Sequence, residues 1–273
     1  MSAQILQTPL ERVLLEAKSE NRAALIGYIP AGFPTIEGCK AAIDVLVTAG
    51  FDAIEIGYPY SDPVMDGPII QEAADLALRN GVKAKDVLAT LAHTSQTGAA
   101  ALVMTYWNPI EQFGSDDFAD AIAVAGGSGV ITPDLSFEQA QPWKESAIKA
   151  GINTIFVVAP STTVERLKKV SSITSGFIYA ASLMGVTGTR NSVSHSAQDL
   201  VSRIREVTDL PIAVGLGVST PEQAREVAKY ADGVIIGSAL IKELLGKNFD
   251  EGLANLKELA QSLASATKSA RLT

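Results

Sequence analysis

The stretch Asp52-Ala-Ile-Glu-Ile-Gly57, which continues as Tyr-Pro-Tyr-Ser-Asp-Pro-Val-Met-Asp-Gly to Pro68, decides the fold. Its first six residues alternate as a β-strand does, so that Glu55 shares one face with Ala53 and Gly57 while two isoleucines form the other face. A carboxylate between small neighbours on the inward face of a buried strand is energetically expensive. We therefore expect a buried strand that ends in a functional loop stiffened by prolines.

Short apolar runs like this one alternate with longer amphipathic stretches along the whole chain. This alternation predicts eight parallel strands, each followed by a helix, which is the pattern of a closed (β/α)8 TIM barrel. The predicted strands are Ala23–Ile29, Ala53–Gly57, Ala101–Tyr106, Gly129–Pro133, Thr154–Val158, Gly176–Ala181, Ile212–Gly215 and Gly233–Ile236. The predicted helices are Ile36–Thr48, Ile69–Arg79, Ala84–His93, Asp116–Ala125, Phe137–Lys149, Val164–Ser171, Ala197–Val207, Pro221–Tyr230 and Leu253–Ala266.

Two further features decorate the predicted barrel. Leu10–Lys18 reads as an extra N-terminal helix that could close the barrel floor, and Ser238–Leu245 reads as a short additional helix before the last one. Two short helices are also expected after the second strand. A doubly wound open sheet is the structural alternative, but it usually carries a glycine-rich turn after the first strand, where this chain has Tyr28-Ile-Pro-Ala-Gly-Phe-Pro34.

The composition fits one globular domain over residues 1–273, because about 250 residues complete a barrel of this kind. No apolar run is long enough to span a membrane, and the N-terminus has no secretory leader pattern. The net charge of −8 leaves no basic patch for nucleic acid. A single cysteine, Cys39, precludes an internal disulfide and suits a reducing cytoplasm, where we expect the protein to be located.

The active site of such a barrel lies at the carboxyl ends of the strands. No lysine ends a predicted strand, which argues against a Schiff-base aldolase, and no cluster has metal-ligand spacing, so we predict no metal site. His93 and His195 fall in helical or loop context. Acid–base chemistry is therefore left to carboxylates, with Glu55 as the best candidate. The spacing of Asp66 fits equally well a functional carboxylate or the N-cap of the following helix.

Glycine-rich turns follow three successive predicted strands, as Met184-Gly-Val-Thr-Gly-Thr189, Gly215-Leu-Gly-Val-Ser-Thr220 and Gly237-Ser238. Glycines let backbone N–H groups approach a ligand, and loops after strands seven and eight with a short extra helix form the recurrent phosphate site of this fold. Because such a site needs no Arg or Lys, an acidic protein can bind an anionic ligand there.

An apolar and aromatic wall is expected across from the phosphate corner. The strand-end residues that would form it are Tyr28, Met104, Tyr106, Ile131 and Tyr179. Such a wall suits a flat apolar body attached to a phosphorylated chain.

Together these segments resemble the family of tryptophan synthase α subunits over nearly the whole chain. The resemblance rests on residues 55–68, on Gly-Val-Thr-Gly at 185–188, on Gly-Leu-Gly-Val-Ser at 215–219 and on Gly-Ser-Ala at 237–239. It implies a lyase of tryptophan biosynthesis that cleaves indole-3-glycerol phosphate to indole and glyceraldehyde 3-phosphate.

The resemblance also implies residue roles. Glu55 would move protons at indole C3 and at a substrate hydroxyl, Asp66 would hold the indole N–H, and Tyr179 would line the same site. Thr187 matches the loop threonine that meets the aspartate when the loop closes. The phosphate site would be formed by Gly188, Gly217, Gly237 and Ser238, and the indole pocket by Tyr28, Met104 and Ile131.

The family's α subunit works with a separate β subunit in an α2β2 heterotetramer, and that subunit carries pyridoxal phosphate, so no cofactor is expected in this chain. Asp62 and Pro63 match the segment that touches the partner. Three positions depart from the commoner family pattern: Phe33, where aspartate is frequent, the pair Leu183-Met184, where Arg-Ala is frequent, and Ser136, where proline is common.

Two rival functions remain open at this point. A phosphate-binding isomerase on the same barrel would share the glycine turns but would not need the 55–68 loop. A non-enzymatic chain that only activates a partner could lose its catalytic residues, and the presence of Glu55, Asp66 and Tyr179 argues against it.

Overall fold

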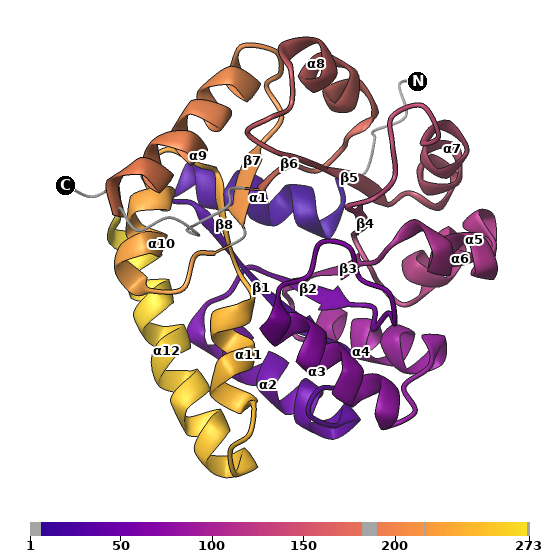
Figure 1. Ribbon diagram of the computed structural model, residues 1–273, viewed down its shortest axis with the longest axis vertical. Coiled ribbons are helices and arrows are strands. Elements are labelled where there is room, and N and C mark those ends of the chain that lie inside the picture. The colour runs from indigo at the N-terminus through magenta and orange to yellow at the C-terminus, as the bar shows by residue number, and fades with distance from the viewer. Residues whose placement is uncertain (1–6, 182–189, 216, 272–273) are drawn as a thin grey trace.

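The computed structural model describes residues 7–181, 190–215 and 217–271, with the side chains of 190–195 left aside. These residues form eight strands and twelve helices that alternate around a barrel (Figure 1). The strands are β1 Ala24–Pro30, β2 Ala53–Gly57, β3 Ala100–Met104, β4 Gly129–Thr132, β5 Asn153–Val158, β6 Ile178–Ala181, β7 Ile212–Gly215 and β8 Gly233–Ile236. The helices are α1 Pro9–Ser19, α2 Ile36–Ala49, α3 Pro68–Arg79, α4 Ala84–Gln96, α5 Trp107–Phe113, α6 Ser115–Val124, α7 Gln141–Ala150, α8 Val164–Ile173, α9 Arg190–Arg205, α10 Pro221–Ala228, α11 Ser238–Leu244 and α12 Phe249–Ser269.

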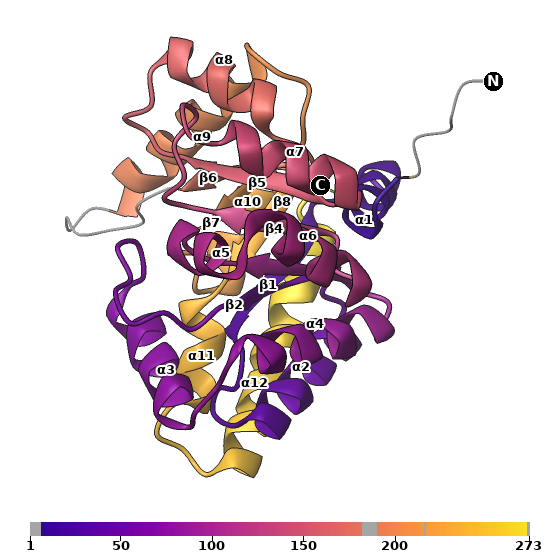
Figure 2. The same cartoon turned by 90° about the vertical axis from the view of Figure 1, so that its right-hand side faces the viewer.

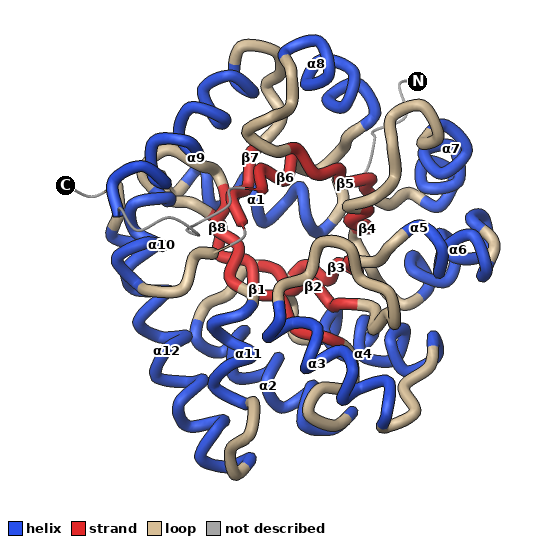
Figure 3. Tube along the Cα trace, viewed as in Figure 1, coloured by secondary structure: helices blue, strands red, loops and turns tan. Residues whose placement is uncertain are grey.

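The strands close on themselves in sequence order, with β1 hydrogen-bonded to both β2 and β8, and every pair is parallel. Figure 3 shows the ring of strands inside an outer layer of helices. The open doubly wound sheet that the sequence left as an alternative is therefore wrong. Closure removes sheet edges, and it turns one residue in two of each strand toward an interior without solvent.

Two apolar clusters follow from this alternation. The outward-facing strand residues pack against the helices in the larger cluster, while the inward-facing ones form a second cluster with α1. Leu10, Leu14 and Ala17 supply the buried stripe of α1. Figure 2 places α1 at the end of the barrel opposite the loop between β2 and α3. The predicted N-terminal helix and its position at the barrel floor are both confirmed.

Four helices differ from the sequence-based expectation. The short helix α5 was not predicted, because a seven-residue helix with Pro109 in its first turn shows too little periodicity. Helix α7 begins at Gln141, with Pro142 in its first turn, rather than at Phe137. Helix α9 begins at Arg190 rather than at Ala197, and α12 extends over Phe249–Ser269 rather than over Leu253–Ala266. Among the helices that the structure describes, none combines the length and the apolar character needed to cross a membrane.

A hydrogen-bond network attaches α1 to the barrel. Asn153, at the start of β5, accepts a hydrogen bond from the Thr8 hydroxyl at 2.6 Å and donates one to the Glu11 carboxylate at 3.0 Å. Thr8 and Glu11 also form the reciprocal capping box of the helix. The residues that cap α1 therefore also fix its position below the barrel.

We predict that Asn153→Ala lowers the free energy of unfolding by about 1–3 kcal/mol, because Asn153 is buried and its loss leaves two helix-cap groups without their partner. Urea denaturation followed by circular dichroism measures the change. The control Ser19→Ala removes one exposed hydrogen bond from the same helix and should change stability by less than about 0.5 kcal/mol. Equal effects from the two substitutions would contradict the proposed attachment.

Candidate active site

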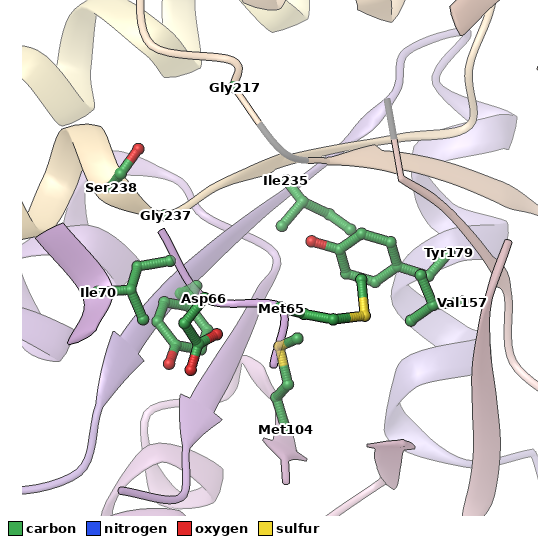
Figure 4. Close-up of a pocket in the computed structure, with 11 residues that line it drawn as sticks. Met65, Asp66, Ile70, Met104, Val157, Tyr179, Gly217, Ile235, Gly237 and Ser238 are labelled. Atoms are coloured by element: carbon green, nitrogen blue, oxygen red, sulfur yellow. The ribbon is translucent and has the colours of Figure 1, made fainter. Parts of the chain in front are cut away.

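A cavity opens at the carboxyl ends of the strands (Figure 4). Its walls come from most of the barrel and are mainly apolar. The described lining residues are Tyr28, Met65, Asp66, Ile70, Met104, Val157, Tyr179, Gly217, Ile235, Gly237 and Ser238. In Figure 4, Asp66 and Tyr179 project into the cavity from opposite sides. The predicted site residues that line this cavity are Tyr28, Asp66, Met104, Tyr179, Gly217, Gly237 and Ser238.

Glu55 lies inside the barrel on β2, between Tyr28 of β1 and Leu102 of β3 in the strand register. Its side chain is 0% exposed, and neither carboxylate oxygen makes a hydrogen bond to another described residue. Desolvation by this burial raises the pKa of Glu55 to about 8. Near neutral pH Glu55 is thus a neutral carboxylic acid that can give up a proton and take one back.

Asp66 lies in the loop between β2 and α3, partly buried at the cavity wall. The N-cap position of α3 is occupied by Gly67, without a side-chain cap, so the helix-cap interpretation of Asp66 is wrong. Desolvation raises the pKa of Asp66 above its usual range, and a hydrogen bond with the Tyr106 hydroxyl acts in the opposite direction. The two carboxyl groups therefore differ in environment, because only Asp66 has a donor that stabilises its ionised form.

Tyr106 holds the loop that carries Asp66. Its hydroxyl oxygen accepts a hydrogen bond from the backbone N–H of Met65 at 3.1 Å, and its ring packs against that of Tyr60 with centroids 5.3 Å apart. The sequence analysis placed Tyr106 only in the apolar wall and missed this contact. A hydroxyl-bearing aromatic residue just beyond β3, beside a long neighbouring loop, is the signal that could have found it.

Two inward-facing glycines make room for the tyrosines of the site. A Cβ atom on Gly57 would lie 2.3 Å from the hydroxyl oxygen of Tyr28, and one on Gly215 would lie 2.4 Å from that of Tyr179. Each tyrosine ring therefore crosses to the neighbouring strand, from β1 onto β2 and from β6 onto β7. Burial raises the pKa of both phenols well above the usual value, so both remain protonated hydrogen-bond donors.

The glycine corner of the cavity lies after β7 and β8. Gly217 has a φ of +99°, which an L side chain rarely adopts. Gly237 occupies the N-cap position of α11 and Ser238 is the first residue of that helix. None of the described lining residues is Lys or Arg. Any anion in this corner would be held by backbone and hydroxyl donors, as the sequence predicts. Thr187 and Gly188 lie outside the described residues.

Some predicted positions lie elsewhere. Ile131 is the register partner of Met104, but it is fully buried in the interior cluster and does not line the cavity. Conversely, Val157 and Ile70 line the cavity and were not predicted. The inward phase of β5 could have identified Val157. His93 pairs with Asp44 at 2.8 Å between α4 and α2, away from the cavity.

The predicted partner-contact segment is exposed. Asp62 is exposed and Pro63 is half-buried, and the neighbouring Val64 is 74% exposed. Of the positions that depart from the family pattern, Phe33 is fully buried in the larger cluster and the Ser136 hydroxyl bonds to Gln139. Leu183 and Met184 lie outside the described residues.

Comparison with known proteins supports this geometry. Residues 14–268 match the family described as "Tryptophan synthase alpha chain". The tryptophan synthase alpha chain of Thermobifida fusca is 53% identical over 96% of this chain and 99% of its own length, and that of Streptomyces avermitilis is 52% identical over 95% and 94%. A structure of Mycobacterium tuberculosis tryptophan synthase has a TM-score of 0.89 at 47% identity, covering 96% of this chain and 99% of its own. A tryptophan synthase subunit alpha from Legionella pneumophila has a TM-score of 0.87 at 31% identity, with 96% and 99% covered. The chain therefore belongs to the tryptophan synthase alpha chain family.

Proposed function

We propose that Glu55, Asp66 and Tyr179 carry out the reaction of this family in the cavity at the carboxyl ends of the strands. The reaction itself follows from family membership: the chain is a lyase of tryptophan biosynthesis that cleaves indole-3-glycerol phosphate to indole and glyceraldehyde 3-phosphate. The isomerase and non-enzymatic alternatives from the sequence are therefore wrong. The observation that carries the residue assignment is the buried Glu55 carboxyl without a partner.

In the proposed mechanism Glu55 begins as a neutral acid and protonates indole C3. The resulting cation carries a C–C bond to the glycerol chain that breaks as the adjacent hydroxyl becomes an aldehyde, and its electrons return to the indole ring. The Glu55 carboxylate takes the proton of that hydroxyl, so one proton enters the substrate and one leaves. A raised pKa of about 8 supports both halves of this cycle.

Asp66 is assigned to the indole N–H, where an ionised carboxylate would stabilise the positive charge on the ring. Its place at the cavity wall and its hydrogen bond with Tyr106 support this role. Tyr179 would face the reacting carbons from the opposite side as a neutral donor, because its ring is fixed over Gly215.

The phosphate is assigned to the glycine corner, with Gly188, Gly217, Gly237 and Ser238, and Thr187 is assigned to a contact with Asp66. The indole ring is assigned to the wall formed by Tyr28 and Met104, with Ile131 behind it as packing. Backbone N–H groups and the start of α11 would supply positive electrostatic potential where the net charge of the chain does not.

We further propose that the chain assembles with a tryptophan synthase β subunit as an α2β2 heterotetramer, with Asp62 and Pro63 in the contact. The exposed Val64 beside them supports an interface at this loop. The alpha chain reaction needs no cofactor, and pyridoxal phosphate belongs to the β subunit. The biosynthetic family and the single, buried Cys39 support a location in the cytoplasm.

Glu55→Gln should leave the fold intact and reduce the rate of indole release from indole-3-glycerol phosphate by roughly 10³-fold or more, because glutamine cannot exchange the proton. The assay is indole formation by the purified chain, with and without a β subunit. The control Glu165→Gln alters an exposed carboxylate in the first turn of α8 and should retain activity. Near wild-type turnover of Glu55→Gln would refute the assignment.

Turnover should also fall on the alkaline side of about pH 8. Burial raises the pKa of Glu55 to about 8, so the neutral acid that starts the reaction dominates below this pH and is lost above it. The expected decline of kcat/KM, which reports the pKa values of the free enzyme, is about tenfold per pH unit once Glu55 is ionised. A kcat/KM that stays constant through this range would exclude Glu55 as the initial acid.

Gly237→Val should weaken the binding of glycerol phosphate analogues, measured by titration calorimetry, because the added methyl groups occupy the phosphate corner. Gly237→Ala serves as a graded control, since its Cβ atom would meet Tyr28 at an ordinary 3.5 Å. The valine variant should lose at least about tenfold more affinity than the alanine variant. Unchanged affinity in the valine variant would remove this corner from the proposed site.

A further inference from the structure

Tyr28 has a position that lining an indole pocket does not require. Its side chain starts on β1 beside Glu55 in the register and crosses onto β2, where the hydroxyl lies against Gly57. Glu55 and Gly57 are two residues apart on the same inward face of β2, so the Tyr28 hydroxyl lies just beyond the Glu55 side chain in the direction of the cavity. Tyr28 lines the cavity, whereas Glu55 does not.

The second carboxyl group, that of Asp66, lines the same cavity as Tyr28. Burial raises the pKa of Tyr28 most, and the charges of Asp66 and of Glu55 raise it further. Tyr28 makes no side-chain hydrogen bond to another described residue. A buried phenol that lies between two carboxyl groups and is not engaged elsewhere can accept a hydrogen bond from one and donate to the other.

We propose that Tyr28 is a positioning residue whose hydroxyl, in the substrate-loaded site, accepts a hydrogen bond from protonated Glu55 and donates one to ionised Asp66. This inference rests on the proposed roles of the two acids. The arrangement assigns the single proton of the pair to Glu55, which must begin as an acid, and leaves the negative charge on Asp66, which must face the indole cation. This arrangement also requires glycine at position 57, because any side chain there would displace the Tyr28 hydroxyl.

The other phenols near the site have different positions. Tyr106 contacts Asp66 from the loop side and is already engaged by the backbone of Met65. Tyr179 is held over Gly215 on the far side of the barrel. Among the described residues, Tyr28 is the cavity-lining tyrosine whose strand register places it beside Glu55.

The test is the pH dependence of kcat in Tyr28→Phe, which removes one oxygen and keeps the ring. The titratable groups whose charges act on the Tyr28 hydroxyl, or on which its charge acts, are Glu55, Asp66, Tyr106 and Tyr179. Losing the donor to Asp66 disfavours its ionised form, so the acid limb of the profile should move to higher pH. Removing the Tyr28 oxygen, which accepts the hydrogen bond from protonated Glu55, disfavours the neutral form of Glu55 and lowers its pKa. The alkaline limb of the profile should therefore move to lower pH.

We expect each limb to move by about half a pH unit or more and kcat at the optimum to fall roughly 3- to 30-fold. The KM should change by less than about twofold, because the ring that contacts indole remains. An infrared titration gives a readout independent of turnover. The carboxylic acid band of Glu55 is identified by its absence in Glu55→Gln. As the pH rises, this band should disappear at a lower pH in Tyr28→Phe than in the wild type. Tyr230→Phe, which removes a half-buried hydroxyl just after α10, is the matched control and should move neither limb.

A narrowed profile supports the inference. A profile of unchanged width, or an alkaline limb that moves to higher pH, would overturn it, because a ring that only fills space makes the Glu55 site drier when its oxygen is removed. These outcomes are separate from a failure of the proposed function. If Glu55→Gln stays active, the catalytic assignment fails, whereas an inactive Glu55→Gln with an unshifted Tyr28→Phe profile rejects only the role of Tyr28.

Discussion

The desolvation of one carboxyl group, that of Glu55, is the constraint on which the rest of the site depends. A closed barrel excludes water from its interior, and the described neighbours of Glu55 provide no hydrogen bond to replace it. Burial disfavours the ionised carboxylate, so the group stays protonated at neutral pH and can donate this proton to the substrate. Water at this position would return the pKa of Glu55 toward its ordinary value and remove the acid.

The barrel also determines how the second acid is arranged. Asp66 cannot come from a strand without being buried like Glu55, and it is instead carried by a loop that reaches over the strand ends. Tyr106 supplies what the loop backbone does not, a fixed partner and a donor for the carboxylate. Two acids of similar intrinsic strength are thus made different by depth and by hydrogen bonding.

Much of this was accessible from the sequence, for identifiable reasons. Period-two alternation with small residues beside Glu55 is sufficient to bury it, and eight such runs are sufficient to close a barrel. The role of Asp66 was not decided by spacing, because Asp-Gly-Pro before a helix is equally typical of a cap, and only the backbone of α3 shows that Gly67 takes that position. The depth of the cavity could not be predicted from the sequence either. Alternation predicts that Ile131 faces the barrel interior, but not whether the cavity extends as far as Ile131. The Tyr106 contact joins segments that are 41 residues apart, so the sequence offers only an indirect signal for it, a hydroxyl-bearing aromatic residue just beyond β3.

Helix α1 determines on which side of the barrel substrate can enter and products can leave. Leu10, Leu14 and Ala17 fill the floor of the barrel, and Asn153 fixes the helix there. The cavity therefore opens at the carboxyl ends of the strands, and packed side chains close it on the side of the floor. Substrate enters and both products leave on the side of the β2–α3 loop (Figure 2).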